Sequence, residues 1–267
     1  MILRANFHTH TDFCDGKNSP EEMLLAAINL GFTHLGFSGH MDADIHMDFA
    51  SYKREIHRLR EKYSGQIQIL CGVELDNLYE LDDLDARKNL DYVIGSTHFL
   101  NVQYTRPLSV DNTPEDLQLL CDEFFSGDFY KLVRAYYELE AQIFTRTNCD
   151  FVGHFDLLTK FNHGNIFFNE NDSRYRNSAL DALEIIAHQG IMFEINTHNS
   201  RIMPAAFILK RLRELNGEII INSDAHSTTQ LNAKFPEAVE LARTCGFDHT
   251  NILELHDNEL ITRQIAL

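Results

Sequence analysis

The sequence predicts an α/β fold built from parallel β-α units, and three observations lead to this class. Short apolar segments alternate along the chain with amphipathic helical ones, the pattern of strands joined by helices. The chain has 267 residues, close to the roughly 250 of a barrel made of such units. No linker rich in Pro, Gly or Ser divides it. Seven or so units in sequence predict either a barrel or a long open sheet.

Seven segments are predicted to be strands because each is short, apolar and followed by turn residues. They are Ile2–Phe7, Thr33–Ser38, Gln66–Gly72, Tyr92–Gly95, Phe151–Gly153, Ile191–Asn196 and Glu218–Asn222. The first predicted helix begins at Pro20, with Ser19 as its N-cap, and ends at Gly31. Further helices are expected at Phe49–Tyr63, Tyr130–Thr145, Tyr175–Gln189, Pro204–Leu215 and Pro236–Cys245.

Two long loops are expected, and the first is a candidate lid. It runs from Leu100 to about Asp116 and contains Arg106 and two prolines. Loops of this length inside a compact domain are often functional. The second runs over Asn162–Asn177 and is rich in Asn and Gly.

The composition of the chain indicates which kinds of binding partner and which cellular compartment to expect. The formal net charge is −17, which disfavours nucleic acid because its affinity depends on neutralising phosphates. The five cysteines are scattered, as expected for free thiols in a reducing cytoplasm. No apolar run approaches the roughly 18 residues of a membrane span, and no signal peptide is apparent. We make no prediction of oligomeric state.

Metal-ligating residue types follow the predicted strands. His8 and His10 end the first strand, and residues two apart point to the same face. Sites in parallel α/β folds assemble at the carboxyl ends of strands, so ligands from different strands meet there. The full candidate set is His8, His10, Asp15, His40, Glu74, His98, His154, Asp224 and His226.

The size of this set predicts more than one metal ion. A tetrahedral site takes four protein ligands at most, so two or three ions are expected. Imidazole and carboxylate together suit Zn, Fe or Mn, and Glu74 can bridge two ions. Two ions can activate a bridging hydroxide that attacks phosphorus, so no protein nucleophile is needed. We expect this hydroxide to be held by Glu74, His8, His10, His98, His154 and Asp224.

The order of these residues resembles that of the PHP (polymerase and histidinol phosphatase) family. The match extends from residue 8 to residue 226, and several motifs look like the histidinol-phosphate phosphatase branch. These motifs are Cys14-Asp15-Gly16, Gly72-Val73-Glu74, Ser96-Thr97-His98-Phe99, Gly153-His154-Phe155-Asp156 and Glu194-Ile195-Asn196-Thr197.

The resemblance implies a fold, a metal arrangement and a reaction. The fold is a distorted (β/α)7 TIM-like barrel, with residues 1–267 forming a single PHP-type phosphoesterase domain. The reaction is hydrolysis of L-histidinol phosphate to L-histidinol and phosphate in histidine biosynthesis, in the cytoplasm. The implied ligand sets are His8, His10, Glu74 and Asp224 for one ion, Glu74, His98 and His154 for a second, and Asp15, His40 and His226 for a third.

A small phosphorylated substrate needs contacts besides the metals. Arg201 and Lys160 follow strands near the site and are candidate phosphate ligands, as is Arg106. His198 is a further candidate contact, and Asp42 is a candidate partner for a substrate amine. Family members often have Ser-Gly where this chain has His198-Asn199-Ser200, and the cation after the fifth strand is Lys160. The phosphate contacts therefore differ from the family pattern.

Three other functions compete with this interpretation. Another PHP phosphoesterase activity would act on small nucleotides or phosphodiesters. A metal-dependent amidohydrolase would often bridge its metals with a strand lysine, and Lys160 is the first lysine found at a predicted strand end. A non-enzymatic metal-binding protein would have a closed site, whereas long loops and nearby cations here suit an anionic guest.

Overall fold

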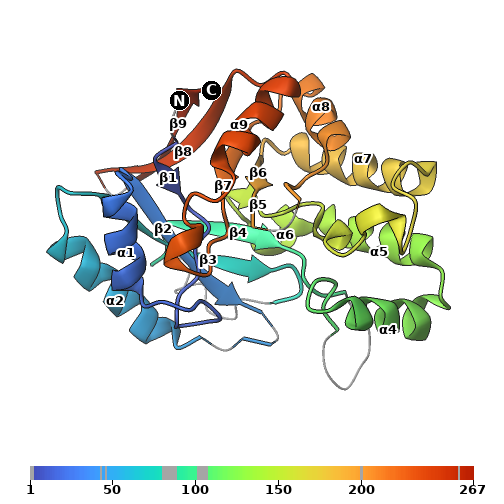
Figure 1. Ribbon diagram of the computed structural model, residues 1–267, viewed down its shortest axis with the longest axis horizontal. Helices are drawn as coiled ribbons and strands as arrows, with labels where there is room; N and C mark the ends of the chain where they lie inside the picture. The colour runs from blue at the N-terminus through green and yellow to red at the C-terminus, as the bar shows by residue number, and fades with distance from the viewer. Residues whose placement is uncertain are drawn as a thin grey trace.

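The computed structural model describes residues 3–42, 44–45, 47–79, 89–100, 108–198, 201–257 and 259–267 (Figure 1). Arg106, one of the predicted substrate contacts, lies outside these residues, as does the part of the candidate lid from 101 to 107.

Nine strands in this part of the chain form one curled sheet, and each strand pairs with the next one in sequence (Figure 1). Neighbours are parallel from β1 to β8, and β9 is antiparallel to β8. The strands are β1 (Ala5–Asn6), β2 (His34–Met41), β3 (Gln68–Asp76), β4 (Tyr92–Ser96), β5 (Phe151–Val152), β6 (Met192–Asn196), β7 (Ile219–Asn222), β8 (His249–His256) and β9 (Glu259–Ala266). The predicted distorted barrel of β-α units is confirmed, and all seven predicted strands are found.

The first and seventh strands meet just beyond their carboxyl ends. Thr9 and Ala225 form a parallel bridge there. The amide of His10 donates to the Ala225 carbonyl over 2.8 Å, and the Ala225 amide donates to the His8 carbonyl over 3.0 Å. This bridge therefore holds two of the candidate ligands beside the segment that follows β7.

The hairpin of β8 and β9 was not predicted, and its sequence explains why. Most of β9 is exposed, so it lacks the apolar alternation that marks a buried strand. The hairpin also joins the two sides of the curled sheet. The Gln68 side chain on β3 donates to the Leu255 carbonyl of β8 over 2.9 Å and accepts from the Leu255 amide over 2.7 Å.

Helices lie on the outside of the sheet (Figure 1). The α-helices are α1 (Pro20–Asn29), α2 (Phe49–Lys62), α4 (Pro114–Phe125), α5 (Phe129–Glu140), α6 (Ile143–Thr147), α7 (Ser173–Ala187), α8 (Ala206–Glu214) and α9 (Phe235–Thr244), and short 3₁₀ turns occur at η1 (Leu157–Thr159), η2 (His163–Asn165) and η3 (Thr228–Gln230). Helix α1 begins as predicted, because Ser19 and Glu22 form a reciprocal capping box.

One helix was not predicted, and one predicted helix is divided in the structure. Helix α4 begins at Pro114, inside the segment that was assigned to a loop, and Thr113 caps it by accepting from the Asp116 amide. The predicted helix Tyr130–Thr145 is divided into α5 and α6. The chain turns so that Ile143 packs over β4 at Gly95, where an added Cβ would lie 2.8 Å from Ile143 Cγ1.

Side chains that point into the barrel change from apolar to polar along the strands. On β3, Leu70, Gly72 and Glu74 share the inner face in turn because alternate residues of a strand point the same way. The buried inner layer consists of Ala5, Phe7, Leu70, Tyr92, Ile94, Phe151, Met192, Ile220, Ile252 and Leu253. This apolar layer fills the interior of the barrel below the carboxyl ends of the strands. The polar side chains of the site lie above it, at those carboxyl ends.

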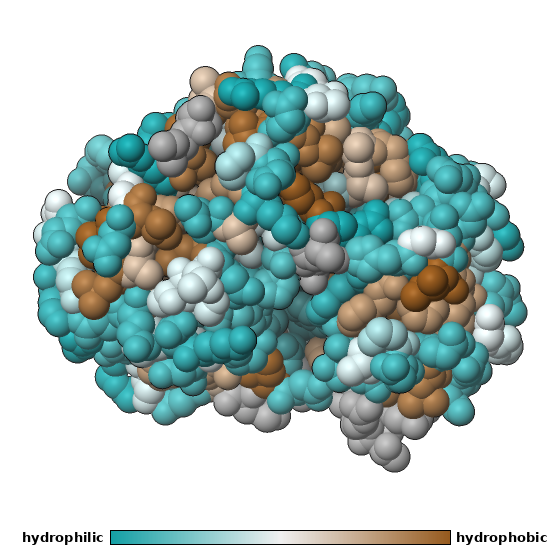
Figure 2. Space-filling model, viewed as in Figure 1, coloured by the Kyte–Doolittle hydropathy of each residue, from teal (hydrophilic) through white to brown (hydrophobic). Residues whose placement is uncertain are grey.

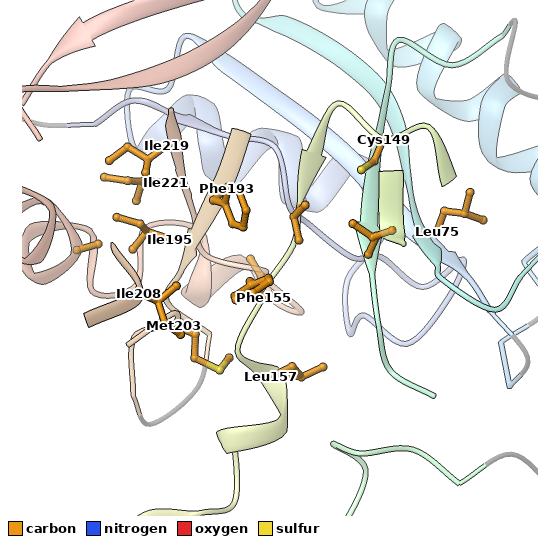
Figure 3. Close-up of a cluster of buried hydrophobic side chains, with 14 of the residues drawn as sticks. Leu75, Cys149, Phe155, Leu157, Phe193, Ile195, Met203, Ile208, Ile219 and Ile221 are labelled. Carbon is orange, nitrogen blue, oxygen red and sulfur yellow. The ribbon is translucent and has the colours of Figure 1, made fainter. Parts of the chain in front are cut away.

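A second, larger core lies between the strands and the surrounding helices. Phe193 and Ile195 on β6 and Ile219 and Ile221 on β7 point outward into it (Figure 3). Ile208 of α8 packs in the same cluster, with 0% exposure. The two strands are thus buried on both faces, which explains their nearly continuous apolar sequence.

The face of the molecule shown in Figure 2 is mainly hydrophilic, with separate apolar patches. None of the helices in the described ranges combines the length and apolar character of a membrane span.

Tyr92 spans the inner layer, and the first prediction concerns the space it occupies. Its hydroxyl lies 2.6 Å from the Phe7 carbonyl and 3.0 Å from the Phe37 carbonyl. A Cβ added at Gly72 would lie 2.4 Å from Tyr92 Cζ. We expect Gly72→Ala to lower the free energy of unfolding by about 1–3 kcal/mol, because the packed interior resists extra volume.

Urea unfolding of Gly72→Ala, followed by circular dichroism, measures this loss. Ser64→Ala, at an exposed position after α2, is the control and should stay within about 0.5 kcal/mol of the wild type. Equal stability of Gly72→Ala and the wild type would contradict the close packing around Tyr92.

Candidate metal centre

The structure brings together all nine residues that the sequence predicted as metal ligands. His8 and His10 follow β1, and Asp15 lies in the next turn. His40 and Glu74 lie near the ends of β2 and β3, where they pair in register. The others come directly after β4, β5 and β7: His98, His154, Asp224 and His226. Parallel strands expose their carboxyl ends at one edge, which explains the convergence.

The Glu74 carboxylate lies at the middle of this cluster, and three histidines approach its Oε2 atom. Nε2 of His8 is 3.1 Å away and Nε2 of His10 is 3.4 Å away. Nδ1 of His40 is 3.2 Å away. Glu74 is only 1% exposed, so water does not compensate its charge.

Two more histidines approach the other oxygen of Glu74. Nε2 of His154 lies 2.7 Å from Oε1, and Nε2 of His98 lies 3.4 Å from it. The Ser96 hydroxyl donates to the same oxygen over 2.6 Å. One carboxylate therefore contacts five histidines, three through Oε2 and two through Oε1.

Asp224 and Asp15 extend the cluster on the other side of His10. Asp224 Oδ1 lies 3.1 Å from Nε2 of His10 and 3.6 Å from Nε2 of His8. Asp15 Oδ2 lies 3.0 Å from Nε2 of His226 and 3.7 Å from Nε2 of His40. The carboxylates thus alternate in space with the imidazoles.

Buried polar atoms in this cluster lack hydrogen-bond partners among the described residues. A buried polar atom without a partner is costly, so each one calls for a ligand. The unpartnered atoms of the predicted ligands are His8 Nε2, His10 Nε2, His40 Nδ1, Glu74 Oε2, His98 Nδ1, His154 Nδ1 and Asp224 Oδ1. Most of them lie close to a potential metal-ligating atom of another residue in the cluster, as the distances above show. The residues present therefore fit divalent metal ions.

Overlapping groups of these donors can hold several ions. In each group the ligand atoms lie within 4.8 Å of one another. One group, His10, Asp15, His40 and His226, contains the whole predicted third set, and another, His8, His10 and Glu74, contains three of the four residues of the predicted first set. A further group combines Glu74 and His98 with His40, where the predicted second set has His154. Imidazole with carboxylate is the donor set of Zn, Fe or Mn, so the centre can bind two or three such divalent ions.

Electrostatics in the cluster follow from burial and mutual contact. Burial opposes ionisation of Glu74, but His8, His40 and His98 outweigh it and hold the pKa of Glu74 well below its usual range. Burial, together with His226 and His40, lowers the pKa of His10 to about 3. A histidine that stays neutral has a free lone pair, the form that binds metal.

Glu194 on β6 is a buried acid that the list of predicted site residues omitted. Its carboxylate accepts from Nδ1 of His8 over 2.8 Å and from the His154 amide over 2.9 Å. The side-chain amides of Asn196 and Asn222 donate to it as well. Metal-binding histidines are commonly oriented through their second nitrogen, and Glu194 does this for His8. The signal in the sequence was an acidic residue whose neighbours along the strand are apolar.

Asp76 has the corresponding position beside His98. Its Oδ2 accepts from the His98 amide over 2.8 Å and lies 3.4 Å from Nδ1 of the same residue. Asp76 is 1% exposed and ends β3, two residues after Glu74. It shares a strand face with Glu74, because β3 continues to Asp76, beyond the end of the predicted strand at Gly72.

A cavity of about 330 Å³ opens onto the donor cluster, and three of the predicted substrate contacts line it. These are Lys160, His198 and Asp42. Asp111, which was not predicted, also lines it, and its Oδ2 accepts from Lys160 Nζ over 3.0 Å. Burial opposes ionisation of Asp111, but His98 and Lys160 lower its pKa to about 2, so it is an anion that holds the Lys160 ammonium.

Arg201 is placed differently from the prediction. It does not line the cavity but forms a bidentate ion pair with Glu170, with N–O distances of 2.7 and 2.9 Å. The Asn162 side chain also donates to Glu170, over 3.0 Å. Arg201 therefore ties the segment after β6 to the loop before α7.

Cys14 is the cysteine nearest the cluster, with Sγ 3.6 Å from Nδ1 of His10. Burial and the adjacent Asp15 raise the pKa of this thiol to about 11. At neutral pH it is protonated and is a poor nucleophile. The cluster thus depends on imidazole and carboxylate groups for its chemistry.

Comparisons with known proteins identify the family of this chain. The PHP domain model matches residues 6–198, most of the chain. The chain is 29% identical to "Probable histidinol-phosphatase" of Deinococcus radiodurans, over 92% of this chain and 95% of that protein. It is 25% identical to histidinol-phosphatase of Bacillus subtilis, over 90% and 99%.

A solved structure shares the fold. Histidinol phosphate phosphatase of Lactococcus lactis, complexed with zinc, L-histidinol and phosphate, superposes with a TM-score of 0.71. It is 19% identical and covers 98% of this chain and 100% of its own. The residues matched by the family model include seven of the nine predicted ligands, from His8 to His154, and Asp224 and His226 follow the matched segment. This chain belongs to the PHP domain family.

Proposed function

We propose that the protein is a metal-dependent phosphoric monoester hydrolase that converts L-histidinol phosphate to L-histidinol and phosphate in histidine biosynthesis. The observation that carries the proposal is that Lys160 and several of the predicted metal ligands line the same cavity. Asp111 holds the Lys160 ammonium there. A divalent centre with an adjacent cation suits an anionic ester. Curated relatives of matching length are named histidinol-phosphatases, which supports the choice of substrate.

The residues of the chain divide the work between binding metal and binding substrate. When bound, two or three divalent ions would activate water and neutralise charge on the phosphate oxygens. The nine predicted ligands would hold those ions, with Glu194 orienting His8 through Nδ1 and Asp76 accepting from the His98 amide. Cys14, as a protonated thiol, takes no part as nucleophile.

Lys160 is the cation that we assign first to the phosphate. It lines the cavity and is held by Asp111, so its ammonium is already positioned there. Arg201, the other predicted phosphate contact, would have to leave Glu170 to reach the substrate. Breaking a bidentate ion pair costs energy, whereas Lys160 can contact a phosphate while it stays near Asp111.

Asp42 is the acid that we assign to the amine of the substrate. It lines the cavity and is 4% exposed. One of its oxygens, Oδ1, accepts from the amides of Asp44 and Ile45 over 2.7 and 2.8 Å. This fixes the carboxylate at the wall of the cavity, where it can pair with an ammonium group.

Charge and composition support the rest of the proposal. A net charge of −17 opposes binding of nucleic acid, so a small substrate is favoured over a polymeric phosphodiester. All five cysteines are free, as expected in a reducing compartment such as the cytoplasm. Strands β8 and β9 follow the matched segment and join the same sheet, which supports one domain over residues 1–267.

A substrate panel tests the reaction. We expect the metal-loaded protein to hydrolyse L-histidinol phosphate with the highest kcat/KM among histidinol phosphate, other phosphomonoesters, a phosphodiester and an amide. A chelator should abolish the activity, and added zinc should restore it. Faster hydrolysis of the diester or the amide would contradict the proposal, because each belongs to a competing class of enzyme.

Substitution of Lys160 tests the phosphate contact. We expect Lys160→Ala to lower kcat/KM by about 10- to 100-fold, the effect of losing one charged hydrogen bond, while metal content stays the same. Lys160→Arg should recover part of the activity because it keeps the charge. Lys210→Ala, at an exposed position on α8, is the matched control. Wild-type kcat/KM in Lys160→Ala would remove Lys160 from the phosphate site.

A further inference from the structure

His198 follows β6 and has contacts that the predicted ligand set does not explain. Its Nδ1 lies 2.7 Å from the backbone carbonyl oxygen of Asp224. Nδ1 of His226 lies 3.0 Å from the same oxygen. The two rings stand side by side, with centroids 4.7 Å apart. One carbonyl group therefore orients both a predicted ligand and a residue outside the predicted set.

These contacts fix the tautomer of His198. A carbonyl oxygen can only accept a hydrogen bond, so Nδ1 of His198 carries the hydrogen. In a neutral imidazole the other nitrogen, Nε2, then has the free lone pair. The same reasoning applies to His226. A histidine whose second nitrogen donates to a backbone carbonyl has the usual arrangement of a metal ligand.

The backbone of Asp224 makes this shared acceptor available. Asp224 has a φ of +49°, a conformation that is uncommon for a residue with a side chain. In this conformation the residue presents its carboxylate Oδ1 to His10 and its carbonyl oxygen to His198 and His226. One residue thus contributes a ligand and orients two imidazoles.

The position of His198 is that of a group facing the cluster. A ring nitrogen of His198, a carboxylate oxygen of Asp224 and a ring nitrogen of His226 all lie within 4.8 Å of one another. His198 also lines the cavity. A histidine that served only to fill the core would be packed against apolar side chains instead.

We propose that His198 is a tenth protein ligand of the metal centre and would bind an ion together with Asp224 and His226, which the predicted sets assign to different ions. This replaces the predicted role of His198 as a substrate contact. The inference uses the fit of the donor cluster to metal and does not depend on the identity of the substrate.

Metal affinity, measured without substrate, tests the proposal. Zinc binding to His198→Ala is followed by competition with a chromophoric chelator, and cobalt is substituted to record the visible spectrum. We expect the weakest zinc site to lose at least about tenfold in affinity, the loss typical when a group that supports a metal site is removed. The cobalt spectrum should change in the same variant.

Two further variants separate a ligand from a group that only positions its neighbour. His198→Asn keeps an N–H that can donate to the Asp224 carbonyl but has no counterpart of Nε2. If His198 is a ligand, the Asn variant should lose as much zinc affinity as the Ala variant. His188→Ala is the matched control, because His188 also bonds a backbone carbonyl through Nδ1, that of Glu184, on an exposed part of α7.

The outcomes are distinct. Wild-type zinc affinity and an unchanged cobalt spectrum in His198→Ala would overturn the proposal. Recovery of wild-type affinity by His198→Asn would also overturn it, since the hydrogen bond alone would then suffice. Failure of the substrate panel would leave these zinc measurements unaffected, so the two proposals can fail separately.

Discussion

The Glu74 carboxylate, buried among five histidines, is the interaction on which the rest of the site depends. Moving a carboxylate out of water costs several kcal/mol unless other groups compensate its charge. Here the histidines at the ends of β1, β2, β4 and β5 supply that compensation, all within 3.4 Å of its oxygens. A bound cation would compensate it further, so affinity for metal follows from the same burial that makes an uncompensated carboxylate costly.

The barrel makes this burial possible by separating its apolar and polar layers. Tyr92 and its neighbours fill the interior, and Gly72 leaves space for the Tyr92 ring directly below Glu74. Above that layer, Glu194 accepts from Nδ1 of His8 and from the His154 amide, and Asp76 accepts from the His98 amide. The Thr9–Ala225 bridge then joins the first and seventh strands beside the site. The packing of the barrel interior, the bridge between its first and seventh strands and the positions of the metal ligands therefore depend on one another.

The sequence predicted the parts of the structure that have strong periodicity. Buried strands and their polar ends identified all nine residues that converge, because position after a parallel strand determines where a side chain lies. It did not predict β8 or its partner β9, which is exposed and lacks apolar alternation, or α4, which begins inside the predicted loop. The roles of Asp111 and Arg201 depend on which side chain lies nearest to each of them in the folded protein. The spacing of residues along the chain does not show this.

Metal content of Glu74→Gln measures the central claim most directly, because Gln keeps the shape of the side chain and removes its charge. Elemental analysis should compare this variant with His98→Ala, which removes one imidazole that contacts Glu74. The account predicts that Glu74→Gln loses more metal per chain than His98→Ala, since Glu74 belongs to two of the groups that could hold an ion and His98 belongs to one. Retention of the full metal complement by Glu74→Gln would contradict the account.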